Sequence, residues 1–228
     1  MPANKEAQKL IYKSIKENHP SFSHTNALYL DLEGTKMLNL FWPQKSGKNR
    51  FKYLNSMNPG FPMSNSGLNN AIKEFDIKED DLRWIVVFRG NLPETREKFN
   101  FYNIFNEKIF HRAEWIDLKY ELNGLPLLKE YIRERKFSHV ITHEPTNTTY
   151  NLENLEEAFG IKRPISLCSS KNKIDGEIGG MKSILTQIQK WESGQADDSD
   201  IKKILNYCKF DVESMFKILK KSQQRKKR

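Results

Sequence analysis

The chain has 228 residues, of which 37% are hydrophobic and 29% are charged, and its formal net charge is +9. This length suits a single domain with a substantial core. No stretch approaches the ~20 apolar residues of a membrane span, and the lysine-rich N-terminus has no signal-peptide core. We therefore expect an intracellular, cytoplasmic protein with no membrane partner, whose two cysteines, Cys168 and Cys208, are reduced thiols.

Predicted helices and strands alternate through the first half of the chain. A short amphipathic helix is predicted over residues 3–18 and ends at His19-Pro20. Apolar runs typical of strands follow, of which the run at 84–88 is the clearest. The predicted elements are strands at 27–33, 37–42, 51–54 and 84–88 and a helix at 67–75. The first three strands suggest an antiparallel meander that opens the sheet.

The second half of the chain is predicted to be mainly helical. Its predicted elements are a strand at 109–118 and helices at 92–105, 125–136, 150–160, 180–192 and 200–221. Gly160 is a typical C-terminal stop for a helix. We expect an N-terminal helical extension over residues 1–25, one α/β domain over 26–220 and a basic disordered tail over 221–228.

Two carboxylates mark the end of the first predicted strand, 27–33. Asp31 and Glu33 are two positions apart and therefore lie on the same face of the strand, and Gly34-Thr35 follow as a turn. Two like charges this close repel each other unless a cation lies between them. A strand that ends in two solvated acids explains the pair equally well when it is taken alone.

Two further acids occur at positions that suit the same site. In the last predicted helix, Tyr207 precedes Asp211 by four residues, which is about one helical turn. Glu94 opens the helix predicted after strand 84–88, and open α/β sheets build their sites outside the carboxyl ends of strands. The helix dipole alone also favours an acid at the position of Glu94.

These three motifs together resemble those of DEDD-type 3′–5′ exonucleases, in the subclass that carries a tyrosine in the third motif. The chain is more closely similar to predicted RNase H-like nuclease domains found with RecB-type nucleases, whose second motif resembles residues 86–96, with Glu94 where classical members have aspartate. Further likeness is found at 115–118, 150–155, 174–177, 191–194 and 207–212. The resemblance extends with gaps from about residue 27 to 219, and residues 122–149 have no counterpart.

The resemblance implies an α/β, RNase H-like fold with a mixed central sheet flanked by helices, and hydrolysis of phosphodiester bonds by a two-metal mechanism. Two Mg²⁺ or Mn²⁺ ions, ~3.5–4 Å apart, are expected, because these cations prefer carboxylate oxygens. The implied roles are Asp31 as bridging ligand, Glu33 and Asp211 on the first ion, Glu94 on the second, and Tyr207 orienting the attacking water. Expected nucleic-acid contacts are Gly34, Thr35, Asn91, Lys171 and Lys173.

Other polar residues have simpler explanations. Asp117 is more readily a cap or turn residue than a ligand, and Asp175 is most simply a turn residue. His139 and His143 are four positions apart, but the β-like residues between them favour a loop or an edge strand over a zinc site.

The net charge of +9 favours a polyanionic partner such as nucleic acid, and much of it lies in residues 220–228. We expect DNA or RNA, with a single-stranded 3′ end, as the partner. The leading function is a metal-dependent 3′–5′ exonuclease. The alternatives are a nucleic-acid-binding protein with an RNase H-like fold and little catalysis, and an endonuclease on the same fold.

Overall fold

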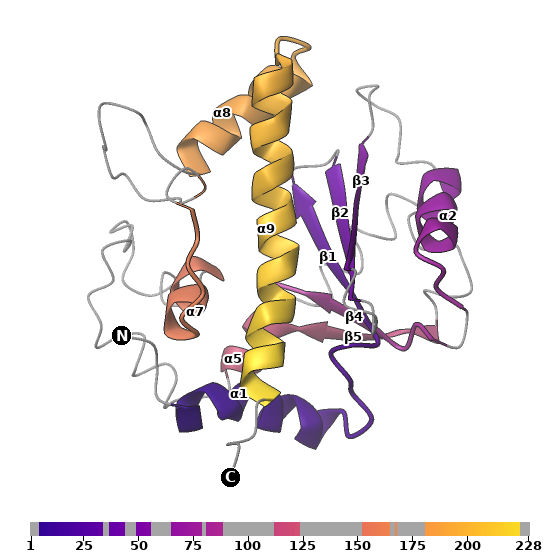
Figure 1. Ribbon diagram of the computed structural model, residues 1–228, viewed down its shortest axis with the longest axis vertical. Helices are drawn as coiled ribbons and strands as arrows, with labels where there is room; N and C mark the ends of the chain where they lie inside the picture. The colour runs from indigo at the N-terminus through magenta and orange to yellow at the C-terminus, as the bar shows by residue number, and fades with distance from the viewer. Residues whose placement is uncertain are drawn as a thin grey trace. The chain divides into compact units, whose positions relative to one another are not determined.

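A computed structural model shows the chain as an α/β protein (Figure 1). It describes residues 5–33, 37–43, 49–55, 65–78, 81–88, 112–123, 152–164, 167 and 181–223. The chain divides into two compact units. We call residues Ser14–Glu121 the sheet unit, and residues Met1–Lys13 with Leu122–Arg228 the helical unit. Helix α1 (Lys5–Asn18) contributes to both, and none of the described helices is long and apolar enough to cross a membrane.

The sheet unit is built on a five-stranded mixed sheet with the order β3-β2-β1-β4-β5. Strands β1 (Ala27–Glu33), β2 (Met37–Trp42) and β3 (Arg50–Asn55) form the predicted antiparallel meander. Strands β4 (Trp84–Val87) and β5 (Glu114–Asp117) follow, with β4 parallel to β1 and β5 parallel to β4. The predicted α/β class with a mixed sheet is therefore confirmed.

Most predicted elements agree with the structure within two residues at each end. The strand predicted at 109–118 differs, because only Glu114–Asp117 is a strand among its described residues and Leu118 already begins helix α5 (Leu118–Asn123). The helices predicted at 92–105 and 125–136 lie outside the described residues.

One face of the sheet packs on helix α2 (Asn65–Glu74). Leu30 of β1 and Leu40 of β2 are paired in register, and both belong to a buried cluster that includes Ile72 of α2 and Phe75, the residue after α2. Each fully buried aliphatic or aromatic side chain contributes about 1.5–3 kcal/mol to the hydrophobic term. This cluster therefore fixes which side of each strand faces inward, and with it the register of the sheet.

The opposite face carries the other residues of β1. The Tyr29 ring packs edge-to-face on Phe41, with centroids 5.9 Å apart, and its hydroxyl donates to the backbone oxygen of His24 (2.9 Å). Phe22 makes a similar ring contact with Trp84 of β4 (5.4 Å). The segment after α1 thus anchors the N-terminal half of β1, and the chain direction brings Asp31 and Glu33 to its other end.

The helical unit contains α7 (Leu152–Ala158), α8 (Met181–Glu192) and the long helix α9 (Asp198–Gln223). Both α7 and α8 contact α9 (Figure 1). Gly160 ends α7 with a positive φ of 62°, as its role as a helix stop predicts. Helix α9 begins at an N-terminal cap, where the Asp197 carboxylate accepts the backbone N–H of Asp200 (2.8 Å).

Helix α9 continues three residues into the segment predicted as a disordered tail. The Lys221 ammonium donates to the backbone oxygens of Phe159 (2.8 Å) and Gly160 (3.1 Å), which lie at the C-terminus of α7. Ser222 is buried and its hydroxyl donates to the Leu219 oxygen (2.7 Å). A cation that satisfies the last carbonyls of a helix explains why this polar segment is held. The predicted disordered tail is therefore wrong for residues 221–223. For residues 224–228, which lie outside the described residues, it stays a prediction.

Candidate active site

Asp31 lies at the carboxyl end of the central strand. Strand β1 pairs with the parallel strand β4 as far as Tyr29 and Val86, and Asp31 follows two residues later. Glu33 is the last residue of β1, and the alternation of a strand places it on the same face as Asp31. Both acids therefore come from the edge of the sheet at which open α/β folds bind their ligands.

Asn39 is the cross-strand neighbour of Asp31. The two residues are paired in register on β1 and β2, so their Cβ atoms share one face, about 4.5–5.5 Å apart. Asn39 is fully buried, yet within the described part of the chain neither its amide oxygen nor its amide nitrogen has a hydrogen-bond partner. Leaving such a group unsatisfied costs about 1–3 kcal/mol. Its position beside Asp31 therefore makes Asn39 a candidate functional residue.

Asp117 caps a helix, which is the role that the sequence favours over that of a metal ligand. Its Oδ1 accepts the backbone N–H of Lys119 (3.0 Å) and of Tyr120 (3.4 Å), so it caps the first turn of α5. It is paired with Val87, whose side chain faces α2, whereas Asp31 faces the other side of the sheet. Asp117 is therefore not part of a ligand set with Asp31.

This assignment predicts the behaviour of Asp117→Ala. Loss of the cap should lower the free energy of unfolding by about 0.5–2 kcal/mol, measured by urea denaturation. Any nucleic-acid hydrolysis measured for the wild type, as the motifs predict, should be equal in the variant at a temperature where the variant is folded. A collapse of turnover without loss of stability would instead make Asp117 part of the site.

Tyr207 and Asp211 lie on the buried side of α9. They are one turn apart, and both are buried, with 7% of each whole residue exposed. Cys208 between them is buried and forms no disulfide within the described part of the chain. The helical periodicity of this segment therefore brings the two predicted site residues together in space.

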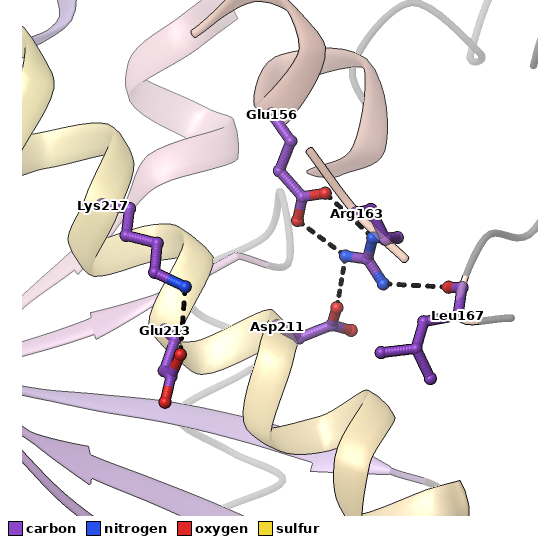
Figure 2. A network of polar contacts seen from close by, with 6 residues as sticks. All are labelled: Glu156, Arg163, Leu167, Asp211, Glu213 and Lys217. Carbon is purple, nitrogen blue, oxygen red and sulfur yellow. Dashed lines mark hydrogen bonds and ion pairs between the residues drawn. The ribbon is translucent and has the colours of Figure 1, made fainter. Parts of the chain in front are cut away.

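Arg163, which follows α7, joins Asp211 to Glu156 (Figure 2). Its Nε and Nη2 donate to the two carboxylate oxygens of Glu156 (2.9 and 2.7 Å), a bidentate pair. Nη2 also donates to Oδ1 of Asp211, and Nη1 donates to the backbone oxygen of Leu167 (3.3 Å). The guanidinium carbon lies 5.3 Å from the ring centroid of Tyr207, within cation–π range.

The three charged side chains of this network are almost fully removed from water. The exposed fractions of the side chains alone are 5% for Arg163, 1% for Glu156 and 10% for Asp211. Burial alone would lower the pKa of Arg163, but the charges of Asp211 and Glu156 outweigh it and raise that pKa further. Burial raises the pKa of Glu156, and the hydrogen bond and charge of Arg163 offset this only in part. Arg163 is therefore the permanent cation of the network.

The raised pKa of Glu156 predicts a pH dependence of stability. The pKa of a glutamate carboxyl group in an unfolded chain is ~4.3. Because the folded protein raises the pKa of Glu156 above this value, the folded protein holds the carboxyl proton of Glu156 more tightly than the unfolded chain does around and above that pH. Stability from this group is present below the unfolded pKa and is lost as the pH rises through the folded pKa. The difference in unfolding free energy, Glu156→Gln minus wild type, should therefore increase with pH. Urea denaturation of both proteins from pH 4 to 7 measures it, and a difference that stays constant or falls contradicts this account.

The structure describes only some of the site residues that the sequence predicts. Tyr207 and Asp211 lie together in the helical unit, and Asp31 and the backbone of Glu33 lie in the sheet unit. The other predicted site residues lie outside the described part of the chain: Glu94, Gly34, Thr35, Asn91, Lys171 and Lys173. Asp175, His139, His143 and Cys168 lie outside it as well. Within the described ranges, no three His, Cys, Asp or Glu side chains are grouped so that they could hold a metal ion.

Sequence reasoning missed Asn39, Glu156 and Arg163. A signal was present for Asn39, because it interrupts the apolar run 38–42 of a predicted strand. Glu156 likewise falls among apolar residues that the helical period groups on one face, Leu155, Ala158 and Phe159, all of which are buried. A polar residue inside such a run predicts either a buried partner or a function.

No protein-family model, curated protein or solved structure matches this chain. The functional assignment that follows therefore depends on the motifs and on the geometry of the described residues.

Proposed function

We propose that this protein is a metal-dependent 3′–5′ exonuclease with an RNase H-like fold, acting on DNA or RNA. The observation that carries the proposal is the position of Asp31 in the sheet. An RNase H-like sheet has an antiparallel meander of three strands followed by two strands parallel to the first. The order β3-β2-β1-β4-β5 and its strand directions agree with that arrangement, and Asp31 lies near the carboxyl end of the central strand.

The donor atoms near Asp31 suit a hard divalent cation. Asp31 brings a carboxylate to one face of β1, two residues before Glu33, and the buried amide of its cross-strand neighbour Asn39 adds an oxygen. Mg²⁺ and Mn²⁺ prefer oxygen ligands of this kind. In this proposal Asp31, Glu33, Glu94 and Asp211 hold two such ions, which supply an activated water and stabilise the charge that develops on the phosphate.

Tyr207 and the basic residues of the chain have the remaining roles in this proposal. Tyr207, one turn before Asp211, orients the attacking water through its hydroxyl. A phenol with a pKa near ~10 is a weak base by itself, so Tyr207 acts by positioning. The basic residues of the chain, which give it a net charge of +9, hold the phosphates of the substrate without sequence preference.

One observation favours the second candidate, a nucleic-acid-binding protein with little catalysis. Asp211 is a proposed ligand, yet it accepts a hydrogen bond from Arg163, which is already paired with Glu156. A carboxylate engaged with a guanidinium is a weaker ligand for a cation. The two candidates therefore differ in one respect, which is whether a divalent cation gains access to Asp211.

Labelled oligonucleotides distinguish the proposed activities. Single- and double-stranded DNA and RNA should be incubated with the full chain in Mg²⁺, Mn²⁺ or EDTA, with free and blocked 3′ ends and with circular substrates. The proposal predicts stepwise shortening from free 3′ ends that stops in EDTA. Cleavage of circular or 3′-blocked substrates would indicate an endonuclease, and binding without cleavage would indicate the second candidate.

Asn39→Leu tests whether the buried amide serves the site. Replacing a buried amide that has no partner among the described residues by an apolar side chain of similar shape should leave the unfolding free energy unchanged or raise it by about 1–3 kcal/mol. Turnover should fall by about 10–100-fold, as expected for a group that supports a metal ligand. Phe41→Leu, on the same face of β2, is the control and should show the opposite, lower stability with activity retained. Full activity in Asn39→Leu removes Asn39 from the site.

A further inference from the structure

The bonds that Arg163 makes to its two carboxylates are unequal. Glu156 receives two hydrogen bonds, one from Nε and one from Nη2, whereas Asp211 receives one, from an Nη2 that it shares with Glu156. Asp211 is also the most exposed of the three side chains, at 10% against 5% and 1%. The contact to Asp211 is therefore the one that this network can give up most easily.

Arg163 keeps several partners if it releases Asp211. Glu156 still holds it by two bonds, and the backbone oxygen of Leu167 still accepts from Nη1. Its guanidinium carbon also lies over the rings of Tyr207 (5.3 Å) and Phe210 (4.9 Å). A guanidinium with this many contacts stays in place, because its buried charge remains paired.

The charges of the network also leave room for a second cation. One guanidinium faces two carboxylates, so the formal sum is −1 when both acids are ionised. Arg163 therefore neutralises only one of its two partners. A divalent cation on the exposed side of Asp211 changes that sum to +1, which is no larger in magnitude.

We propose that Arg163 is the counter-ion that Asp211 exchanges for a divalent cation. Asp211 is bonded to Arg163 when no metal is bound, and it leaves Arg163 to Glu156 when it becomes a metal ligand. This inference rests on the proposed function, because it takes Asp211 as a ligand. The exchange keeps the buried Asp211 carboxylate paired in the metal-free protein, and it sets the metal affinity of the site through competition.

Calorimetric titration of the full chain with Mn²⁺ tests the exchange. The decisive variant carries Glu156→Gln together with Arg163→Gln, because this removes one charge of each sign and leaves Asp211 with no competing cation in the network. Its dissociation constant for Mn²⁺ should fall by about tenfold or more, equivalent to about 1.4 kcal/mol. The matched control carries Glu213→Gln with Lys217→Gln, which removes a partly exposed ion pair on the same helix as Asp211 (3.0 Å; Figure 2). The control should bind Mn²⁺ as the wild type does.

Arg163→Lys provides a second test in case the double variant does not fold. Lysine keeps the buried charge for Glu156 but lacks the planar fork that spans two carboxylates, so Mn²⁺ should again bind more tightly than in the wild type. Wild-type or weaker Mn²⁺ binding in the variant that folds overturns the exchange, provided that Asp211→Asn abolishes binding. If wild-type binding is absent or unaffected by Asp211→Asn, the metal site itself is wrong and the exchange falls with it.

Discussion

Asp31→Asn should reduce hydrolysis to the level measured in EDTA while the protein stays folded. Asp31 lies near the carboxyl end of the central strand, two residues before Glu33, and Asn39 is its cross-strand neighbour. The substitution preserves the shape of the side chain but removes the charge that a bridging ligand needs. Relief of the repulsion between two neighbouring carboxylates should leave stability unchanged or slightly higher. Turnover of a 3′-labelled oligonucleotide and urea denaturation measure the two effects.

Asp117→Asn is the matched control for this substitution. Asp117 also ends a strand of the sheet, but it lies on the opposite face and accepts the backbone N–H groups of α5. Asparagine is nearly as good a cap as aspartate, so this variant should keep its stability and its turnover. Near-wild-type turnover in Asp31→Asn would show that the site has been assigned wrongly.

Arg163→Met should lower the free energy of unfolding by about 3–5 kcal/mol at neutral pH. Methionine keeps the volume of the side chain but leaves Glu156 and Asp211 buried without their cation. Breaking a buried ion pair by removing one partner has a cost of this size. Urea denaturation of the metal-free protein measures it.

Lys217→Met is the comparison for Arg163→Met. Lys217 also pairs with a carboxylate on α9, that of Glu213, but its side chain is 40% exposed. Pairs in contact with water contribute about 0–1 kcal/mol, so the loss should be small. Equal losses in the two variants would mean that Arg163 is not the centre of a buried network.

The strands and the faces of the sheet could be predicted from the sequence because their pattern is local. The ends of β1 and β2 agree with the prediction, since alternating apolar residues specify both the strand and the side that is buried. The same alternation places Asp31 and Glu33 together. The helical period likewise pairs Tyr207 with Asp211 on α9.

The network around Arg163 could not be predicted in this way because its bonds join distant parts of the chain. Arg163 is seven residues from Glu156 and 48 from Asp211. The chain turns after α7 at Gly160, which brings Arg163 to Glu156, and the packing of α7 on α9 brings both to Asp211. Asp211 was therefore predicted as a ligand from the helical period alone, without the guanidinium of Arg163 to which it is bonded in the structure.

A crystal structure of the full chain grown with Mn²⁺ and a nucleoside monophosphate tests the central claim most directly. The account predicts two anomalous peaks ~3.5–4 Å apart, with the carboxylates of Asp31 and Asp211 on the same ion and Arg163 bonded to Glu156 alone. Carboxylates of Asp31 and Asp211 more than ~10 Å apart, well beyond the reach of a two-metal site, would contradict it.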